Sequence, residues 1–250
     1  MKNKLLRLSK IISHAGVCSR KHAEILVKNG EVKINDKIFK EFAIEKDRIK
    51  SIKVKDMILD RQPVRLWLFN KPIGYVSSNK EQFSQKSLFK LLPKYLPRVV
   101  SVGRLDIQTQ GLMILTNNPT LSTYLENPKN QIKRKYIVKV SGQIPAYCEN
   151  FIEKNILING VYYRNISLKV LDKELDNSIL EIILTEGKNR EIRKVLNHFG
   201  LEVKKLVRIS FGPFKLEALK DGAVSEVKES ILEKFLESIG FDYESYLWKI

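Results

Sequence analysis

Cysteine, histidine and acidic residues are scarce in this sequence of 250 residues. The two cysteines, Cys18 and Cys148, lie far apart and provide neither a disulfide framework nor the spacing of a zinc site. The three histidines, His14, His22 and His198, have no acidic or cysteine partner at metal-ligand spacing, so we expect surface or packing roles for them. No metal is therefore predicted, and two unpaired thiols favour a reducing compartment.

Long apolar runs are missing as well. No stretch has the length of a membrane span, and the segment MKNKLLRLSKIISHAG interrupts its apolar residues with Arg7, Ser9 and Lys10, unlike a signal peptide. The sequence also has no P-loop and no Rossmann glycine pattern. We therefore expect a cytoplasmic protein with no membrane contact, no cofactor and no small-molecule substrate.

Basic residues are abundant by contrast. Lysine and arginine number 45 against 28 aspartates and glutamates, which gives a formal net charge of +17. Such a charge indicates a polyanionic partner, and nucleic acid is the first candidate. A membrane surface is the weaker alternative, because the basic residues are spread through the sequence and do not form a polybasic tail or one amphipathic anchor.

The first quarter of the chain has the pattern of two helices followed by a hairpin. Apolar residues recur at helical spacing from Leu5, and Gly16 ends the first predicted helix. Ser19 is placed to cap a second helix, which stops at Gly30 before an alternating, strand-like run. The sequence therefore predicts a compact unit from Leu5 to about Ile44.

Five basic residues lie around these two predicted helices: Arg7, Lys10, Arg20, Lys21 and Lys28. From spacing alone, a phosphate-binding face and a merely solvated surface are equally open. The segment LSKIISHAGVCSRKHAEILVKNGEVKIND resembles the small RNA-binding domain of the ribosomal-protein-S-four type, in its helix order and in its SR(K)xAxxLVxxGxVxVN phrasing. That resemblance implies that the five residues bind RNA.

A charged, proline-containing stretch, KDMILDRQPVRL, is the predicted linker, with a boundary near Arg61 between domains at 1–61 and 62–250. Beyond it, strand-like runs alternate with helical stretches, which indicates an α+β domain built on a mixed sheet. The strand-like runs lie at 65–69, 135–140, 166–170 and 179–184, and the helical stretches at 87–92, 122–126, 190–199 and 227–239.

The segment SVGRLDIQTQGLMILTNNP places Asp106 beside Arg104 in a turn. An adjacent cation favours the charged form of a carboxylate, which then serves as nucleophile or base, although a surface ion pair is the commoner meaning of such a pair. The segment resembles the GRLDxxTxGLLLLTND motif of pseudouridine synthases almost letter for letter. The resemblance implies that Asp106 is catalytic, that Arg104 holds a flipped nucleotide, and that Thr109 and Gly111 shape the loop.

Two further segments resemble motifs of the same family, the second of them a motif of its branch of ribosomal large-subunit synthases of type B. KRKYIVKVSG matches KxYxVxV, which implies that Tyr136 stacks on the target base. EGKNREIRK matches EGKNRxIRRM, which implies that Arg193 pairs with Asp106 and that Ile192 lines the pocket. The basic turn at 188–190 and the opening motif LWLFNKPIGYVSS add predicted RNA contacts. These are Lys71, Lys188, Asn189 and Arg190.

The resemblance, which runs to about Leu216, implies a mainly antiparallel catalytic sheet flanked by helices and the isomerisation of uridine to pseudouridine. Ribosomal RNA is the expected partner, as a stem-loop or an assembly intermediate bound by a monomer, and large-subunit RNA is the first choice. Small-subunit RNA, transfer RNA and a non-catalytic assembly factor stay open as alternatives. A glycosidase is disfavoured, because only one carboxylate lies in a persuasive motif where that chemistry needs two.

Overall fold

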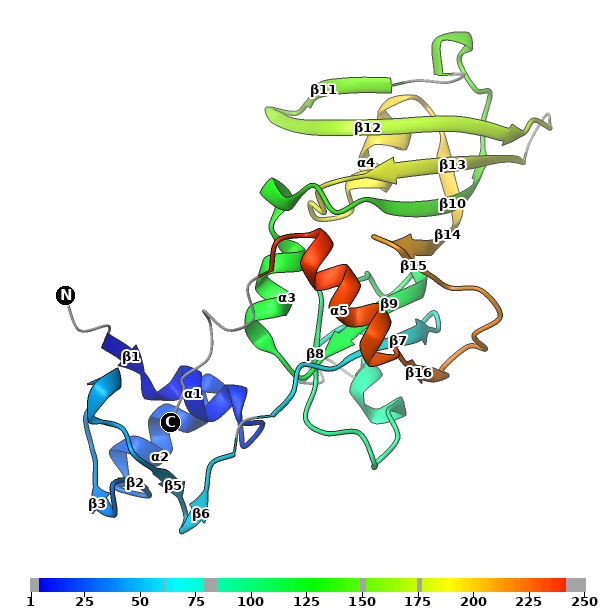
Figure 1. The fold of residues 1–250 in the computed structure, drawn as a ribbon. Coiled ribbons are helices and arrows are strands. Elements are labelled where there is room, and N and C mark those ends of the chain that lie inside the picture. The colour runs from blue at the N-terminus through cyan, green and yellow to red at the C-terminus, as the bar shows by residue number, and fades with distance from the viewer. Residues whose placement is uncertain (1–4, 61, 79–84, 149–151, 175–176, 242–250) are drawn as a thin grey trace.

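The computed structural model describes residues 5–60, 62–78, 85–148, 152–174 and 177–241. The chain forms a small N-terminal domain of helices and hairpins, joined by an extended stretch to a larger domain built on one twisted sheet (Figure 1). The α+β class and the mainly antiparallel sheet are confirmed. The boundary predicted near Arg61 lies at a residue outside the described ranges.

The N-terminal domain begins with a strand, because Leu5–Arg7 pairs antiparallel with Ala43–Glu45. The first helix therefore starts at Leu8, and the prediction of a helix from Leu5 was wrong. The Ser19 hydroxyl caps the second helix as predicted, accepting a hydrogen bond from the His22 amide at 3.2 Å. The elements are β1 (Leu5–Arg7), α1 (Leu8–His14), α2 (Arg20–Lys28), β2 (Val32–Ile34), β3 (Lys37–Ile38), β4 (Ala43–Glu45), β5 (Ile52–Val54) and β6 (Met57–Ile58).

Two similar hairpins form a four-stranded sheet in this domain, in the order β3-β2-β5-β6. Ion pairs of 2.6 Å cross between the hairpins in both directions, from Lys33 to Asp56 and from Lys53 to Asp36. The first four residues of the predicted linker KDMILDRQPVRL, Lys55 to Ile58, belong to the second hairpin, so the linker starts later than predicted. The physical reason is the turn at Lys55-Asp56, where both residues adopt the positive φ of a tight hairpin turn.

The large sheet contains ten strands among the described residues. Its main path runs β11-β12-β13-β10-β14-β9-β7-β16, and only β9 and β14 pair in parallel. The predicted strands at 65–69, 135–140, 166–170 and 179–184 are confirmed as members of this sheet. Its strands are β7 (Leu66–Lys71), β8 (Val100–Ser101), β9 (Gln110–Thr116), β10 (Arg134–Ser141), β11 (Ile152–Ile158), β12 (Val161–Asp172), β13 (Ser178–Leu184), β14 (Glu202–Phe211), β15 (Phe214–Lys215) and β16 (Val224–Glu226).

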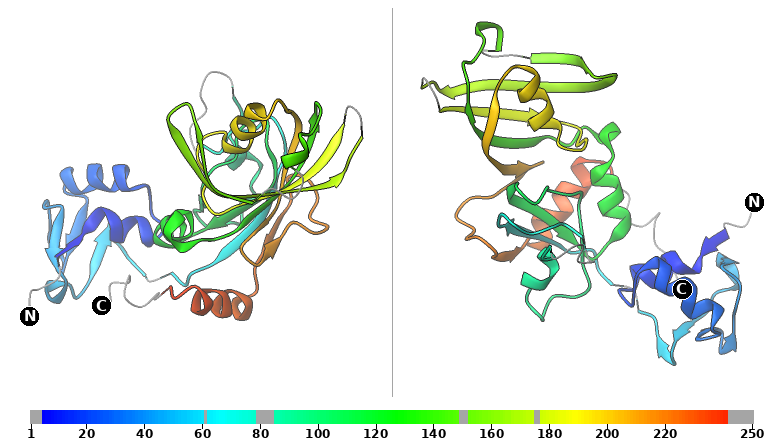
Figure 2. Two further views of the ribbon diagram at one scale, coloured as in Figure 1. Left: turned by 90° about the horizontal axis from the view of Figure 1, so that it is seen from above. Right: turned by 180° about the vertical axis from the view of Figure 1, so that it is seen from behind.

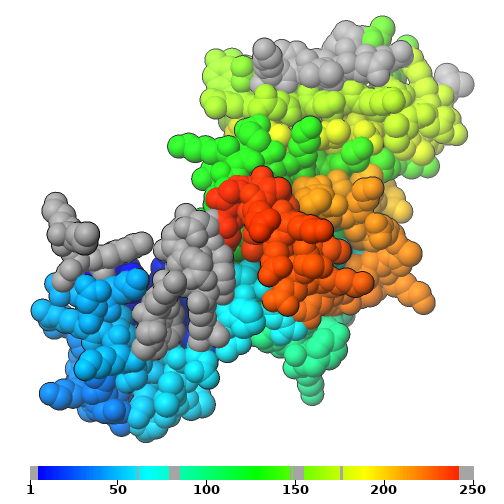
Figure 3. Space-filling model, in the orientation of Figure 1, coloured from blue at the N-terminus to red at the C-terminus, as the bar shows by residue number. Residues whose placement is uncertain are grey.

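Helices cover both faces of this sheet (Figure 2). Helix α4 (Glu191–His198) packs on one face through Val195 and Leu196, while α3 (Pro119–Glu126) and α5 (Glu229–Ser238) pack on the other. Figure 3 shows α5 lying across the surface of the domain, and its Phe235 meets Phe214 edge to face at 4.9 Å. The predicted helix at 87–92 is a short 3-10 turn, Leu88–Leu91.

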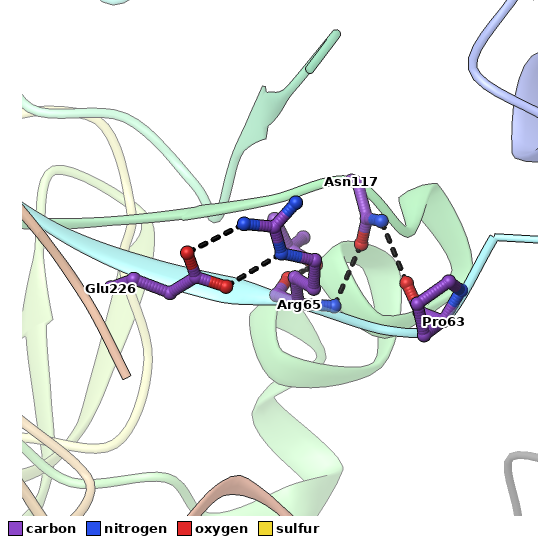
Figure 4. A network of polar contacts seen from close by, with 5 residues as sticks. Pro63, Arg65, Asn117 and Glu226 are labelled. Atoms are coloured by element: carbon purple, nitrogen blue, oxygen red, sulfur yellow. Dashed lines mark hydrogen bonds and ion pairs between the residues drawn. The ribbon is translucent and has the colours of Figure 1, made fainter. Parts of the chain in front are cut away.

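Polar contacts fix the chain where it enters the large domain (Figure 4). The Arg65 backbone amide donates to Asn117 Oδ1, and the Asn117 side-chain amide donates to the Pro63 carbonyl, both at 2.8 Å. The Arg65 guanidinium forms two 2.6 Å contacts with Glu226 on β16. The start of β7 is thereby tied to the end of β9 and to the edge of the sheet.

A partly buried contact joins the two domains directly. His14 Nε2, at the end of α1, lies 2.8 Å from the Thr120 hydroxyl in the first turn of α3. Burial, together with Lys10 and Arg20, lowers the pKa of His14 to about 4. Of the surface and packing roles predicted for the histidines, His14 has the packing role. In the described part of the chain no helix is long and apolar enough to cross a membrane.

Candidate active site

A cavity of about 300 Å³ opens between two loops of the large domain. One wall is the turn between β8 and β9, which carries Arg104 and Asp106, and the opposite wall is the loop from β13 into α4, residues 187–193. Side chains of Tyr136, Leu184 and Leu206, which lie on neighbouring strands, complete the lining. The volume is at the lower end of the range for small-ligand pockets and suits one nucleotide.

The Asp106 turn is held by hydrogen bonds to its backbone. The Thr109 amide donates to the Asp106 carbonyl at 3.0 Å, and the Gly74 amide donates to the Ile107 carbonyl at 2.8 Å. The Ser77 hydroxyl donates to the Leu105 carbonyl and accepts from the Leu105 amide, at 2.9 and 3.1 Å. The turn therefore keeps its shape independently of the Asp106 side chain, which stays partly exposed to the cavity.

Lys71 supports this turn from below. Its ammonium donates to the carbonyls of Pro72, Asp106 and Thr109 at 3.1, 3.1 and 2.8 Å, and the residue is 0% exposed. Burial lowers the pKa of Lys71 to about 8, against the opposing attraction of Asp106. The prediction that Lys71 contacts RNA was wrong, because this side chain is enclosed and its donors are used inside the protein.

Gly111 is required where β9 passes β14. Its φ is +104°, and a Cβ atom there would lie 2.4 Å from the Arg208 carbonyl oxygen and 2.8 Å from the Arg208 nitrogen. Since the clashing atoms are backbone, no rotamer change relieves the contact. The structural role predicted for Gly111 is confirmed.

The predicted pocket residues Tyr136 and Ile192 both line the cavity and are 7% and 5% exposed. Tyr136 reaches it from β10, and Ile192 reaches it from the first turn of α4. With Leu184 and Leu206 they give the cavity an apolar part that suits the face of a base.

Arg193 lies in the cavity wall but forms no ion pair with Asp106 in the described structure, which corrects the predicted direct pairing. Its guanidinium donates to the Val203 and Gln108 carbonyls, each at 3.1 Å. Burial and the charge of Arg190 lower the pKa of Arg193, while Asp106 raises it. Arg193 therefore acts on Asp106 through space and through the Gln108 carbonyl of the same loop.

The other predicted contacts divide into two groups. Arg104, Asn189 and Arg190 are exposed along the cavity, as a role in RNA binding requires. Lys188 also lines the cavity, but its ammonium donates to the Tyr162 carbonyl and to Glu186, both at 2.6 Å. The structure thus uses the Lys188 charge within the protein.

The basic residues predicted in the N-terminal domain lie away from the cavity. Arg7 is exposed on β1, and Arg20, Lys21 and Lys28 are exposed on α2. Lys10 and Arg20 both act electrostatically on His14, so these two charges lie close together. The structure therefore offers a second basic surface, separate from the cavity.

Three carboxylates at or near the cavity were missed by the sequence reasoning: Glu126, Glu186 and Glu191. Glu126 and Glu191 line the cavity, while Glu186 contacts the loop from beneath. Glu186 and Glu191 belong to the matched segment EGKNREIRK, so their position was visible but their burial was not. Within the described ranges, no three His, Cys, Asp or Glu side chains gather as a metal-binding cluster.

Comparison with known proteins bears on both domains. Residues 65–198 match the family described as RNA pseudouridylate synthase, and residues 6–41 match the S4 domain. An uncharacterized RNA pseudouridine synthase of Rickettsia felis is 41% identical over 229 residues, which are 91% of this chain and 99% of that protein.

Ribosomal large subunit pseudouridine synthase B of Bacillus subtilis is 33% identical over 226 residues, covering 88% of this chain and 91% of that protein. A crystal structure of a pseudouridylate synthase superposes with a TM-score of 0.65 at 25% identity, covering 92% of this chain and 99% of the other. The likeness thus extends over both domains and includes the loop that presents Asp106. The chain belongs to the RNA pseudouridine synthase family and carries an S4 domain at its N-terminus.

Proposed function

We propose that this pseudouridine synthase modifies a uridine of large-subunit ribosomal RNA in the cytoplasm, with Asp106 as the reactive carboxylate. The observation that carries the proposal is the nucleotide-sized cavity, in which Asp106 faces a wall bearing Asn189 and Arg190. Relatives in Bacillus subtilis and Buchnera aphidicola, both 33% identical, are named for the large ribosomal subunit, which supports the substrate.

The reaction needs no atoms from outside. The bond between uracil N1 and ribose C1′ breaks, the base turns, and C5 bonds to C1′; the proton lost from C5 is balanced by one gained at N1. A carboxylate at Asp106 serves this chemistry by adding to the sugar or by removing a sugar proton. The cavity accepts only a base that has left its helix, so the uridine is flipped out or presented in a loop.

The surrounding residues have separate tasks in this proposal. Tyr136 presents an aromatic ring to the flipped base, and Ile192 excludes water beside it. Arg104 holds the displaced nucleotide at the exposed rim, and Asn189 and Arg190 contact the strand from the opposite wall. Arg193 attracts the Asp106 carboxylate and fixes its loop through the Gln108 carbonyl.

The experiment that tests the substrate is chemical mapping of pseudouridine in transcripts of large-subunit RNA, small-subunit RNA and transfer RNA after incubation with the protein. We expect conversion at a uridine of the large-subunit RNA alone. Conversion only in one of the other RNAs would overturn the substrate and keep the reaction. Binding without any conversion would favour a non-catalytic assembly factor.

In our proposal the N-terminal domain, placed at 1–61, binds the RNA, and the domain at 62–250 catalyses the reaction. Replacing Arg20 and Lys21 by glutamine is expected to weaken RNA binding several-fold, because two phosphate contacts are lost. For the same reason, the slope of log K against the logarithm of the salt concentration should become shallower by about 2. The value of kcat at saturating RNA should stay unchanged, because both residues lie outside the cavity. Titration of labelled RNA at several salt concentrations measures both effects.

The matched control is the double replacement of Lys215 and Lys220 by glutamine, which makes the same charge change at exposed positions of the large domain. If both double variants weaken binding equally, net charge alone accounts for the effect. The special role of the α2 surface would then be wrong.

A further inference from the structure

Two carboxyl groups are buried beneath the loop that forms one wall of the cavity. Glu186 follows β13 and is 8% exposed, and Glu191 is the first residue of α4 and is 3% exposed. Between them lie residues 187–190, all of which line the cavity. Burying carboxyl groups is costly unless each has hydrogen-bond partners, so their contacts decide the shape of this wall.

Each carboxyl group holds a different part of the loop. Glu186 Oε1 accepts from the Arg164 amide of β12 at 2.8 Å and from the Lys188 ammonium at 2.6 Å. Glu191 Oε2 accepts from the Lys188 amide at 2.8 Å, while the Glu191 amide donates back to the Lys188 carbonyl at 3.2 Å. The turn from Lys188 to Glu191 is therefore closed from both ends, and Arg190 adopts a left-handed conformation with φ 51° inside it.

One oxygen in this arrangement lacks a donor. Glu191 Oε1 is buried and receives no hydrogen bond from any donor in the described structure, while both carboxyl groups bind the same residue, Lys188. Two ionised carboxylates have no hydrogen to share. A proton on Glu191 that is donated to Glu186 satisfies both groups at once.

The nearby cations do not remove this need. The Lys188 ammonium donates to Glu186, whereas only the Lys188 backbone amide donates to Glu191. The buried Arg134 on β10 acts on Glu191 electrostatically, but its Nη1 and Nη2 atoms donate to the carbonyls of Thr185 and Leu125. These cations therefore leave Glu191 Oε1 without a hydrogen-bond donor, which a proton on the pair would supply.

We propose that Glu186 and Glu191 share one proton, and that this carboxyl–carboxylate pair is a positioning device that holds residues 187–190 in the shape that receives RNA. The role in receiving RNA rests on the proposed function, whereas the shared proton rests on the contacts alone. Neither glutamate touches the reacting atoms. Both act through the backbone that presents Asn189 and Arg190.

The directions in which burial and neighbouring groups shift the two pKa values agree with this assignment. Burial raises the pKa of Glu191 to about 7, with the neighbouring Glu186 adding to the shift and the Lys188 amide opposing it. Burial acts on Glu186 too, but hydrogen bonds from Lys188 and the Arg164 amide lower its pKa overall. Glu191 is thus the protonated partner. The pKa of Glu191 is raised on folding. The stabilisation of the loop by the protonated Glu191 is therefore fully present at low pH and is lost as the pH rises through about 7.

The shared proton is tested first without RNA. Carbon-13 NMR of the glutamate carboxyl groups should show Glu191 titrating near pH 7, and the Lys188 amide signal should shift with the same midpoint. In Glu191→Gln the transition at the Lys188 amide should vanish. Titration of Glu191 at the ordinary pKa of a glutamate, or a flat Lys188 amide in the wild type, would overturn the shared proton whatever the protein does to RNA.

The positioning role is tested by the KM for RNA from about pH 6 to about pH 8.5. Wild-type KM should rise several-fold across this range with little change in kcat. Glu191→Gln should keep a low KM throughout, because its amide group donates to Glu186 and its oxygen accepts from Lys188 at any pH. Glu191→Ala should raise KM at every pH.

The control variant is Glu233→Gln, an exposed change on α5, which should follow the wild-type profile. If Glu191→Gln keeps the wild-type pH dependence, or loses as much as Glu191→Ala, the positioning role is wrong. Should no RNA be converted, the same comparison made on RNA affinity separates a failure of this inference from a failure of the proposed function.

Discussion

Replacing Asp106 by asparagine is expected to lower kcat by roughly 10³-fold or more, because the amide has the shape of the carboxylate but serves as neither nucleophile nor base. RNA affinity should stay close to that of the wild type. The turn that carries Asp106 is held through its backbone by Lys71 and by the Thr109 amide, so the change leaves its geometry intact. Single-turnover conversion, with RNA affinity measured alongside, checks both expectations.

Asp172→Asn makes the same chemical change at an exposed position of β12 and should leave kcat unchanged. An Asp106→Asn variant that still converts uridine at a rate near the wild type would remove Asp106 from the reaction. A variant that merely binds RNA less well would make Asp106 a binding residue.

Replacing Lys71 by methionine is expected to lower the free energy of unfolding by about 2–3 kcal/mol, because three buried carbonyls lose their donor. The variant no longer has the desolvation cost of a buried ammonium, but this gain offsets only part of the loss, because methionine cannot donate to those carbonyls. The kcat should fall as well, because two of the three carbonyls, those of Asp106 and Thr109, belong to the turn that carries the proposed reactive carboxylate. Urea unfolding and steady-state kinetics measure the two effects.

Lys129→Met, at an exposed position after α3, should change the unfolding free energy by less than about 0.5 kcal/mol. Unchanged stability and kcat in Lys71→Met, together with weaker RNA binding, would contradict the supporting role of this lysine. Such a result would restore the RNA contact that the sequence suggested for Lys71.

The contrast between Asp106 and Lys71 shows what this sequence reveals on its own. The turn around Asp106 is local, since Gly103, Thr109 and Gly111 lie within a few residues of it, and its motif identified the candidate site. Lys71 lies 35 residues before Asp106, and its burial depends on carbonyls from that distant loop. A lysine in a lysine-proline turn is usually an exposed charge, so its sequence favours the wrong interpretation.

Two other features of the site were not predicted from the sequence, because they too depend on contacts between segments distant in the chain. The Arg193 guanidinium is fixed by carbonyls from two separate segments, at Gln108 and Val203, and only the folded chain shows that these take precedence over a direct contact with Asp106. The burial of Glu186 and Glu191 depends on how the folded chain encloses their loop, which spacing does not reveal.

The second hairpin of the N-terminal domain is different, because a signal was present. The run IKVKDMIL repeats the pattern of VKINDKIF, with Lys55-Asp56 at the place of Asn35-Asp36. Both turns adopt positive φ, but lysine at the first position is a weaker turn signal than asparagine. The charged residues of this run therefore favoured a linker over a strand.

Release of tritium from RNA labelled at C5 of uracil reports the isomerisation itself and not binding, because bond formation between C5 and C1′ expels that hydrogen. We expect the wild-type protein to release tritium from large-subunit ribosomal RNA to the extent of one uridine per molecule, and Asp106→Asn to release none. Tight binding of that RNA by the wild-type protein with no release of tritium would contradict the assignment of this chain as an enzyme that isomerises uridine through Asp106.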